Sequence, residues 1–346
     1  MNSSSSDSAT PHRRRPRYSG KYPKKFSEKY KEHRPDQYPE TVSKVVASGK
    51  TPAGSHLPIM VPEILEALAL NPGSVVIDCT LGYGGHTEAI LPEILPDGRL
   101  IGLDVDPIEQ PKTERRLREL GFGAEVFQVR RSNFAGILKV LSEEKIEGVD
   151  ALLADLGISS MQIDNPERGF SVKHEGPLDM RMNPNKGQPA SAFLEKVSAE
   201  LFAAILEENA DEPNAIRLGS FLAGKKFQTT LELAASIRDY FPQMEGEEQN
   251  LTVRRVFQAL RIEVNEEWNA LDTLLRHLPL ALKSGGRVAI LSFHSGEDRR
   301  VKKAFQAGVR SGIYQAAAEE VIRAGAEERR ANPRSIPAKL RWAIRA

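Results

Sequence analysis

A short glycine-rich turn is the feature of this sequence best suited to bind a nucleotide-like ligand. The apolar run at residues 75–79 leads into Thr80-Leu81-Gly82-Tyr83-Gly84-Gly85-His86, and a helical pattern follows. Glycines at the end of a buried strand let the backbone approach a ligand where any Cβ would collide. A glycine turn alone is weak evidence, but this one lies between a strand and a helix, which is the context that such a site requires.

Two carboxylates narrow the chemistry of the ligand. Asp104 ends the next apolar run, about 20 residues beyond the glycines, where a carboxylate accepts hydrogen bonds from ribose hydroxyls. Alternatively Asp104 caps a helix, although Asp106, followed by Pro107, is the better capping candidate. Asp78 precedes the turn, which lacks the G-x-G-x-x-G spacing of a dinucleotide site. This acidic start favours S-adenosylmethionine, a ligand with an ammonium and a sulfonium group, over NAD.

Longer stretches of the chain resemble one family. The matching segments are residues 56–62, 80–86, 153–162, 168–171, 176–182, 254–265, 292–299 and 332–334. The run Gly176-Pro177-Leu178-Asp179-Met180-Arg181-Met182 is among the most diagnostic. Together they resemble the small-subunit ribosomal RNA methyltransferase H family, also called MraW, which methylates N4 of a cytosine in the decoding region of 16S rRNA. The segment after Asn332 departs from the family pattern, so no C-terminal RNA contact is inferred from it.

The resemblance implies a cofactor, a partner and a set of site residues. The expected cofactor is S-adenosylmethionine, and the expected partner is the small ribosomal subunit with its 16S rRNA. The implied cofactor contacts are Gly84, Gly85 and His86 for the methionine end, Asp104 for the ribose, Phe134 for the adenine pocket, and Asp155 and Gln162. Considered by itself, Phe134 would be assigned to the core, because a single loop Phe packs more often than it stacks.

The target amine sets what the catalytic residues must do. An exocyclic cytosine amine is a poor nucleophile, and an enzyme activates it by accepting hydrogen bonds from its protons. Related amino-methyltransferases often use Asp/Asn-Pro-Pro-aromatic after strand four, whereas this chain has Asp155-Leu156-Gly157-Ile158-Ser159. We predict Asp155 as the polarising group with Ser159 as helper, the alternative being that Asp155 serves only the cofactor. His294 is the candidate proton acceptor; alternatively Ser295 caps the next helix and His294 merely packs.

Charged residues further along the chain are candidates for binding RNA. Asp179 and Arg181 are predicted to bind substrate, because an arginine can clamp a phosphate or stack on a base. The same two residues could instead form a structural salt bridge. Arg254, Arg255 and Arg261 could follow the RNA backbone, although charges on a helix usually form a solvated face.

The apolar pattern predicts the elements that position these residues. Nearly all-apolar strands at 75–79, 99–104, 124–129 and 149–154 alternate with helices at 62–70, 87–95 and 114–120. Such alternation implies an α/β fold with a parallel sheet covered on both faces, the Rossmann-like class I methyltransferase arrangement. The sheet pattern resumes with a helix at 266–282, a turn at 283–286, a strand at 287–293 and an edge strand at 339–345.

The pattern also divides the chain. Residues 161–265 contain helical segments, including 199–208 and 230–240, and no buried strand. We therefore expect a cofactor-binding domain made of residues 51–160 and 266–346, with a helical insertion for substrate recognition after strand four. Residues 1–50 form a basic tail that we predict to be disordered, with ten Lys or Arg against two Glu between residues 11 and 34. It is either an RNA-touching arm or a solubilising tail.

Composition limits the class of protein. The single cysteine, Cys79, excludes intramolecular disulfides and any Cys-based zinc cluster, and we predict no metal site. No apolar run approaches the roughly 18–20 residues that cross a bilayer, and the polar N-terminus lacks a secretory signal. We expect a cytoplasmic protein without membrane contact. The oligomeric state is not determined, and a homodimer is left open.

Three other functions were weighed. A non-catalytic ribosome assembly factor would not need to keep the glycine turn and Asp104. A nicotinamide-dependent oxidoreductase would need the dinucleotide glycine spacing, which is absent. A methyltransferase acting on another amine, in DNA or in a protein, is the main alternative. The basic tail favours a nucleic acid over a protein but does not separate RNA from DNA.

Overall fold

Seven strands form one sheet in the order β3-β2-β1-β4-β5-β7-β6. The computed structural model describes residues 57–346, so the predicted basic tail lies outside the described residues. Strands β1 to β5 are parallel, whereas β7 runs antiparallel to β5 and to β6. The strands are β1 Val75–Asp78, β2 Arg99–Asp104, β3 Phe127–Arg131, β4 Val149–Asp155, β5 Leu282–Ser292, β6 Tyr314–Ala317 and β7 Lys339–Arg345. This arrangement confirms the predicted Rossmann-like α/β fold.

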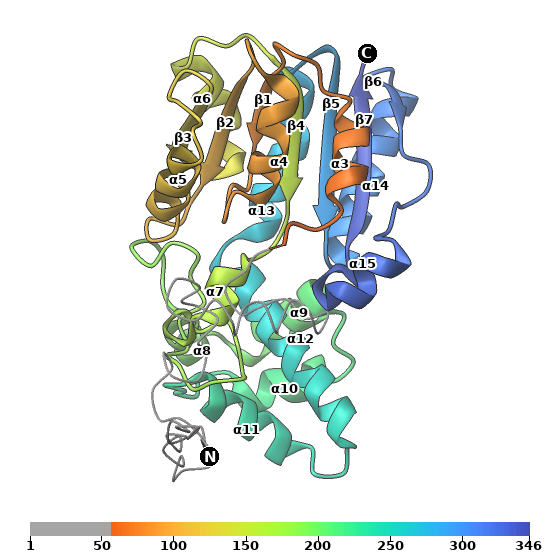
Figure 1. Ribbon diagram of the computed structural model, residues 1–346. Helices are drawn as coiled ribbons and strands as arrows, with labels where there is room; N and C mark the ends of the chain where they lie inside the picture. Colours follow the sequence, from red (N-terminus) through yellow and green to blue (C-terminus); the bar gives the residue numbers. More distant parts are fainter. Residues whose placement is uncertain (1–56) are drawn as a thin grey trace, which may run out of the picture.

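Helices cover both faces of the sheet, which explains why its strands are apolar throughout (Figure 1). Within β1, Val76 packs with the helices of one face and Ile77 with those of the other, because successive side chains of a strand point to opposite sides. The first face carries α3 Val61–Leu68, α4 Gly85–Ile94 and α5 Gln110–Glu119. The second carries α6 Ile137–Glu143, α13 Glu267–Ala281 and α14 Ser295–Arg310.

The strand order creates a crevice at one edge of the sheet. Strand β1 pairs with β2 on one side and with β4 on the other, so the chain changes direction across the sheet beside β1. Ligands of open α/β sheets bind outside the carboxyl ends of the strands at such a point. Asp78, Asp104 and Asp155 are the last residues of β1, β2 and β4, and the fold therefore brings three carboxylates to this edge.

A helical unit stands below the carboxyl edge of the sheet and has a core of its own (Figure 1). It lies between β4 and β5 in the chain, and within residues 160–265 the structure contains helices but no strand, as the sequence predicts. Its helices are α7 Ser160–Asp164, α8 Ala190–Lys196, α9 Ala199–Ala210, α10 Ala215–Leu222, α11 Thr230–Tyr240 and α12 Gly246–Val264. Short 3₁₀ helices at Phe134–Gly136, Pro166–Arg168 and Pro333–Ser335 and the helix α15 Ala326–Ala331 complete the described chain.

Two expectations about the last strands are wrong. The segment Lys339–Arg345 is not at the edge of the sheet, because β6 pairs with its outer side. The sequence does not reveal β6, since its four residues form no long apolar run and only Tyr314 is buried. The predicted turn at residues 283–286 instead belongs to β5, whose pairing with β4 is irregular between Val149 and Ala151. Among the described helices, none combines the length and hydropathy that crossing a membrane requires.

Candidate active site

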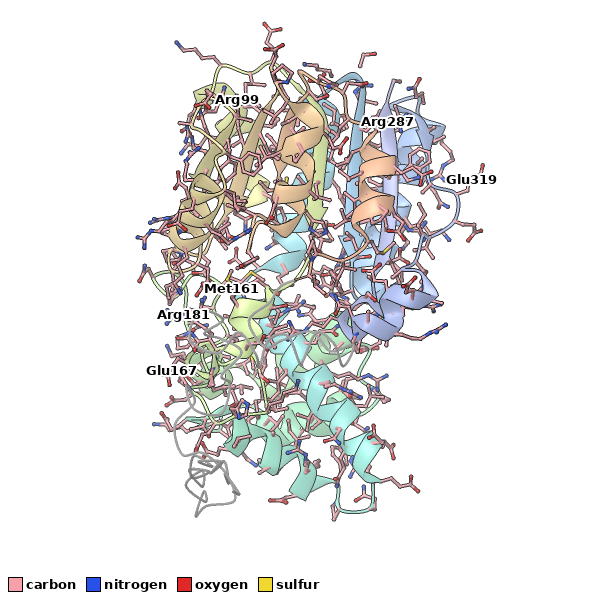
Figure 2. The ribbon with its side chains drawn as sticks, viewed as in Figure 1. Arg99, Met161, Glu167, Arg181, Arg287 and Glu319 are labelled. Carbon is pink, nitrogen blue, oxygen red and sulfur yellow. The ribbon has the colours of Figure 1, made fainter. Side chains whose placement is uncertain are left out.

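A cavity of about 460 Å³ opens at the carboxyl edge of the sheet, between the sheet and the helical unit. This volume lies within the range of sites for small molecules and cofactors. In Figure 2, Met161 and Arg181 lie toward this junction, whereas Arg99 and Arg287 mark the opposite end of the sheet. Of the residues predicted for the site, those that line the cavity are Gly84, Gly85, His86, Asp104, Phe134, Asp155, Ser159 and Gln162.

The glycine turn is held closely by its surroundings. Gly84 has a φ of 80°, and a Cβ added there would lie 2.9 Å from Thr113. A Cβ on Gly85 would lie 3.1 Å from Pro58. The sequence interpretation attributed these glycines to the approach of a ligand, but packing against α5 and Pro58 already requires them. The Thr113 hydroxyl donates to the carbonyl of Gly82 at 2.5 Å, which fixes the turn against α5.

Asp104 lies on the cavity wall with part of its acceptor capacity unused. Its carboxylate accepts hydrogen bonds from the backbone N–H groups of Gly82 at 2.9 Å and Asp106 at 2.8 Å. A carboxylate has about four lone-pair sites, so acceptor capacity remains for two hydroxyls. Burial, together with the nearby Asp106 and Asp78 carboxylates, raises the pKa of Asp104 to about 6. Phe134 lies on the cavity wall at the start of a 3₁₀ helix and also packs against the core of one sheet face, and its contact with adenine remains a prediction.

Asp78 supports the turn from behind. Its carboxylate is 1% exposed, is not part of the cavity wall, and accepts hydrogen bonds from the Thr87 hydroxyl at 2.7 Å and the Thr80 N–H at 3.0 Å. Burial raises the pKa of Asp78 although these hydrogen bonds oppose the rise. The acidic position that favoured S-adenosylmethionine therefore acts through the shape of the turn and not by direct contact.

Asp155 presents an unpartnered oxygen at the cavity. Its Oδ1 is buried without a hydrogen-bond partner among the described residues, and its Oδ2 lies 3.6 Å from Nδ1 of His86. Burial, with Asp78 and Glu297 nearby, raises the pKa of Asp155 to about 6, although His86 opposes the rise. The strand end is fixed, because the Asp155 N–H donates to the Thr80 hydroxyl at 2.6 Å.

The orientation of His86 follows from its second nitrogen. Nε2 lies 2.9 Å from the carbonyl oxygen of Ile59, which can only accept, so Nε2 carries a proton. In the neutral ring, Nδ1 is then an acceptor that faces Asp155. One proton can therefore be shared between Asp155 and His86, in addition to the predicted contact of His86 with the cofactor.

Ser159 and Gln162 have structural tasks as well as places on the cavity wall. They form a capping box at the start of α7, in which the Ser159 hydroxyl accepts from the Gln162 N–H and the Gln162 side chain accepts from the Ser159 N–H. The Gln162 Nε2 also donates to Asp106 at 2.9 Å. The side-chain amide of Gln162 is thus engaged by the protein, and its cofactor contact remains a prediction.

His294 lies outside the residues that line the cavity, whereas Glu297 is one of them. His294, and not Ser295, is the N-cap residue of α14, which corrects the expected capping by Ser295. The Glu297 carboxylate accepts from the Phe293 N–H at 2.8 Å and lies 3.1 Å from Nε2 of His294. Burial opposes its charge, but His294, Arg261 and that backbone N–H outweigh burial and lower the pKa of Glu297. The predicted proton acceptor is thus separated from the cavity by a carboxylate that sequence reasoning did not assign.

Asp179 and Arg181 bind each other. The guanidinium donates from Nε at 2.8 Å and from Nη2 at 2.7 Å to the two carboxylate oxygens, and from Nη1 to the Gly187 carbonyl at 3.3 Å. Neither side chain lines the cavity. These contacts are those of the structural salt bridge that the sequence left open as the alternative, and binding of substrate by this pair remains a prediction.

Sequence reasoning missed the part of the wall contributed by the end of α12 and the start of α13. Arg261, Glu267 and Trp268 all line the cavity. The Arg261 side chain is 16% exposed and therefore does not belong to a solvated helix face. Of the two alternatives stated for this residue, this excludes the solvated face and leaves a contact with RNA as a prediction. Its only sequence signal was membership of the matching segment 254–265, because a single arginine on a helix does not reveal which way it points.

The donor set fits S-adenosylmethionine. A buried carboxylate with free lone pairs suits the ribose, and a glycine turn offers backbone groups to the methionine end. Asp155 lines the remaining space with a carboxylate whose Oδ1 has no hydrogen-bond partner among the described residues. Residues 53–346 also match the sequence profile described as the MraW methylase family. The chain belongs to the MraW methylase family. As a member of this family, it is an S-adenosylmethionine-dependent methyltransferase.

Relatives of the MraW family resemble this chain over most of its length. The "Ribosomal RNA small subunit methyltransferase H 1" of Agathobacter rectalis is 48% identical, over 97% of this chain and 98% of its own. The "Ribosomal RNA small subunit methyltransferase H 2" of Alkaliphilus metalliredigens is 48% identical, over 96% of this chain and 97% of its own. A Geobacter relative, "Ribosomal RNA small subunit methyltransferase H", is 41% identical over 83% of this chain and 97% of its own. The first two matches extend beyond the described residues into the N-terminal segment.

Proposed function

We propose that this protein methylates N4 of a cytosine in the decoding region of 16S rRNA, within the small ribosomal subunit. The observation that supports this most directly is the buried, unpartnered Oδ1 of Asp155 in the cavity beside the glycine turn. The names of the relatives point to small-subunit rRNA as the acceptor. An enzyme that acts on ribosomal subunits works where ribosomes are, so the proposed location is the cytoplasm.

Asp155 is proposed to activate the amine. Its free oxygen accepts a hydrogen bond from an N4 proton, which concentrates the nitrogen lone pair for attack. S-adenosylmethionine supplies a methyl group on a positively charged sulfur. When nitrogen gains that methyl group it must lose a proton, and the Asp155 carboxylate takes it up, with Nδ1 of His86 3.6 Å away as a second acceptor. Ser159 and His294 have no comparable free acceptor facing this position, so we assign them supporting roles.

The cofactor would be held by the sheet side of the cavity. We propose that Gly84, Gly85 and His86 receive the methionine end, Asp104 the ribose and Phe134 the adenine, with Gln162 closing the site from α7. In this division residues 51–160 and 266–346 bind the cofactor, and the helical insertion 161–265 recognises the RNA. The separate core of the helical unit supports that division.

The test is methyl transfer from labelled S-adenosylmethionine to small subunits that lack the modification, followed by mapping of the methylated nucleotide by mass spectrometry. Wild type, Asp155→Asn and a matched control, Asp239→Asn, are compared. Asp239 is exposed on α11, so the substitution Asp239→Asn removes the same charge at a position that does not line the cavity. We expect Asp155→Asn to lower kcat at least about 100-fold, while cofactor affinity stays within about threefold.

The result separates the alternatives. Label in N4-methylcytosine that depends on Asp155 supports the proposal. Label in a different amine would keep the methyltransferase and replace the acceptor. Binding of subunits without any transfer would favour an assembly factor that does not catalyse. A loss of cofactor affinity equal to the loss of rate in Asp155→Asn would mean that Asp155 serves only the cofactor.

A further inference from the structure

Arg261 lies on the cavity wall that the helical unit contributes, close to the loop that carries Asp155. It comes from the last turn of α12. Its Nη1 would lie 3.9 Å from a Cβ added to Gly157, two residues after Asp155. That Cβ would have no other neighbour within 4 Å among the atoms of the described residues beyond its own chain neighbours, so the guanidinium is the side chain nearest to this loop position.

A carboxylate determines which donors of Arg261 remain free. Glu267 accepts from Nε at 2.8 Å and from Nη2 at 2.9 Å, a bidentate ion pair. An arginine has five N–H donors in a fixed planar fork, and this contact uses two of them. The other three, on Nη1 and Nη2, have no hydrogen-bond partner within residues 57–346. Two of these three, one on Nη1 and one on Nη2, form a second pair of adjacent donors, and Arg261 lines the cavity.

The surroundings hold this guanidinium in place. Asn265, at the end of α12, donates to the carbonyls of Arg261 and Met180, both at 2.8 Å, and accepts from the Met182 N–H at 2.7 Å. Burial opposes the charge of Arg261, but the Glu267 and Glu297 carboxylates outweigh burial and raise the pKa of the guanidinium. Arg261 is therefore charged and preorganised before any substrate arrives.

Stability does not explain this ion pair. Arg261 and Glu267 are 16% and 13% exposed, and pairs with so little contact with water are often no more stabilising than apolar residues of similar size. A charged fork with free donors on a cavity wall is instead suited to bind acceptor atoms. On a pyrimidine with an exocyclic N4 amine, the acceptor N3 lies next to that amine, and the acceptor O2 follows N3 on the same edge of the base.

We infer that Arg261, oriented by Glu267, recognises the N3 and O2 acceptors of the target cytosine and so determines which base is presented to Asp155. This assignment rests on the proposed function. Uracil is disfavoured because its N3 carries a proton that opposes the arginine donors, and adenine because it has no carbonyl acceptor beside the ring nitrogen. Arg261 is thus a specificity-determining residue, and Glu267 is a positioning residue that acts through it.

The test alters one acceptor atom on the base and one donor group on the protein. Small subunits are reconstituted with cytidine or 3-deazacytidine, which lacks the N3 acceptor, at the modified position. Wild type, Arg261→Met and Arg261→Lys are compared by kcat/KM. The intrinsic reactivity of the altered base is the same for all enzymes. A difference between enzymes in the ratio of kcat/KM on cytidine to kcat/KM on 3-deazacytidine therefore reports the contact between Arg261 and N3.

We expect wild type to lose about 10- to 100-fold in kcat/KM on 3-deazacytidine, the range for a hydrogen bond to a charged group. On cytidine, kcat/KM of Arg261→Met should be lower than that of wild type by a similar factor. Changing the substrate to 3-deazacytidine should lower kcat/KM of Arg261→Met by less than about threefold. Arg261→Lys should give values between those of wild type and Arg261→Met. Arg276→Met makes the same charge change on α13 and should match wild type. Within residues 57–346 the Arg276 guanidinium donates hydrogen bonds to Asp272 and Thr273 of its own helix.

Cofactor affinity within about twofold of wild type shows that each variant is folded with an intact cofactor site. Equal losses on 3-deazacytidine for wild type and Arg261→Met would overturn the assignment, because the contact would then not depend on Arg261. Transfer by wild type to a different nucleotide or to none would instead remove the proposed acceptor, and the assignment of the cytosine edge with it.

Discussion

At the scale of single residues, burial of the Asp155 carboxylate destabilises the fold and also makes the carboxylate a better proton acceptor. Burial raises the pKa of this carboxyl to about 6, and the same burial leaves Oδ1 free of partners. A carboxylate without hydrogen bonds to satisfy it is a better acceptor for an amine proton than one already bound. The residue is therefore suited to chemistry and poorly suited to stabilising the fold.

The pH dependence of the reaction should show this carboxylate. With saturating cofactor, kcat should fall as the pH drops through about 6, by up to about tenfold per pH unit below it, because the protonated carboxyl cannot accept the amine proton. The cofactor must be saturating because the pKa of Asp104, the proposed ribose ligand, is also raised to about 6, so cofactor binding could change over the same pH range. A single-turnover pH profile measures the effect. The low residual rate of Asp155→Asn should not vary in this range, and a profile like that of wild type would contradict the assignment.

Removing the charge of Asp155 should also stabilise the protein without its cofactor. A pKa raised in the folded state means that the folded protein ionises less readily than the unfolded one, so stability falls as the pH rises from about 4 through 6. The full shift corresponds to about 3 kcal/mol, and the side chain is 29% exposed, so we expect Asp155→Asn to gain about 1–2 kcal/mol at pH 7.5. Urea unfolding measures it. Equal stability at pH 7.5 and a gain at pH 4 would contradict the argument.

At the scale of elements, a buried ion pair joins the helical unit to the sheet. Arg168, in the 3₁₀ helix after α7, donates to Asp106 in the loop after β2 at 2.6 Å, and the two are 6% and 1% exposed. The same guanidinium donates to the carbonyls of Arg181 and Met182. Asp106 follows the predicted ribose ligand Asp104 by two residues, so one contact links the loop beside the cofactor to the segment at Arg181.

Loss of this link should be costly. Arg168→Met leaves the Asp106 carboxylate buried without its cation, and we expect a loss of about 3–5 kcal/mol in the free energy of unfolding. Adding Asp106→Asn should recover part of it, because the uncompensated charge is then gone. Arg334→Met is the control, since Arg334 is 43% exposed and pairs with Asp164 near the surface, a contact worth less than about 1 kcal/mol. Similar losses for both arginines in denaturant titrations would show that burial of the pair is unimportant.

At the scale of the whole molecule, basic residues are concentrated in the N-terminal segment of the sequence. The basic residues between positions 11 and 34 lie outside the described structure, yet the two relatives that are 48% identical match this chain into that segment. The Geobacter relative covers only 83% of the chain. The N-terminal segment is therefore matched by some relatives, and its basic residues are candidates for a contribution to RNA affinity.

Deleting residues 1–50 should weaken RNA binding and reduce its dependence on salt. Lysines and arginines that neutralise phosphates release counterions, so their removal should lower the slope of log affinity against log salt concentration by at least about 2. A salt titration of rRNA binding measures the slope, and cofactor affinity is the control for the fold. An unchanged slope would leave the segment with only a solubilising role.

The sequence by itself determined the class of fold, the helical insertion and the edge of the sheet at which we propose that the cofactor binds. These depend on local patterns, namely all-apolar strands, intervening helices and a glycine turn at a strand end, and such patterns are visible in one chain. It did not place β6, whose short segment has little apolar character of its own. Nor did it show that His294 lies off the cavity wall while Glu297 lies on it.

Only the tertiary structure decided which charged side chains share the cavity. Asp155 lies more than a hundred residues before Arg261 and Glu297. The three come together because β4 and α12 end, and α14 begins, beside the cavity. The direction in which a helical arginine points depends on packing of its helix against others, and not on the residue itself. Arg181 was expected to bind substrate, but its guanidinium forms an ion pair with Asp179. Arg261 was expected on a solvated helix face or along the RNA backbone, but it lines the cavity and has N–H donors without a partner among the described residues.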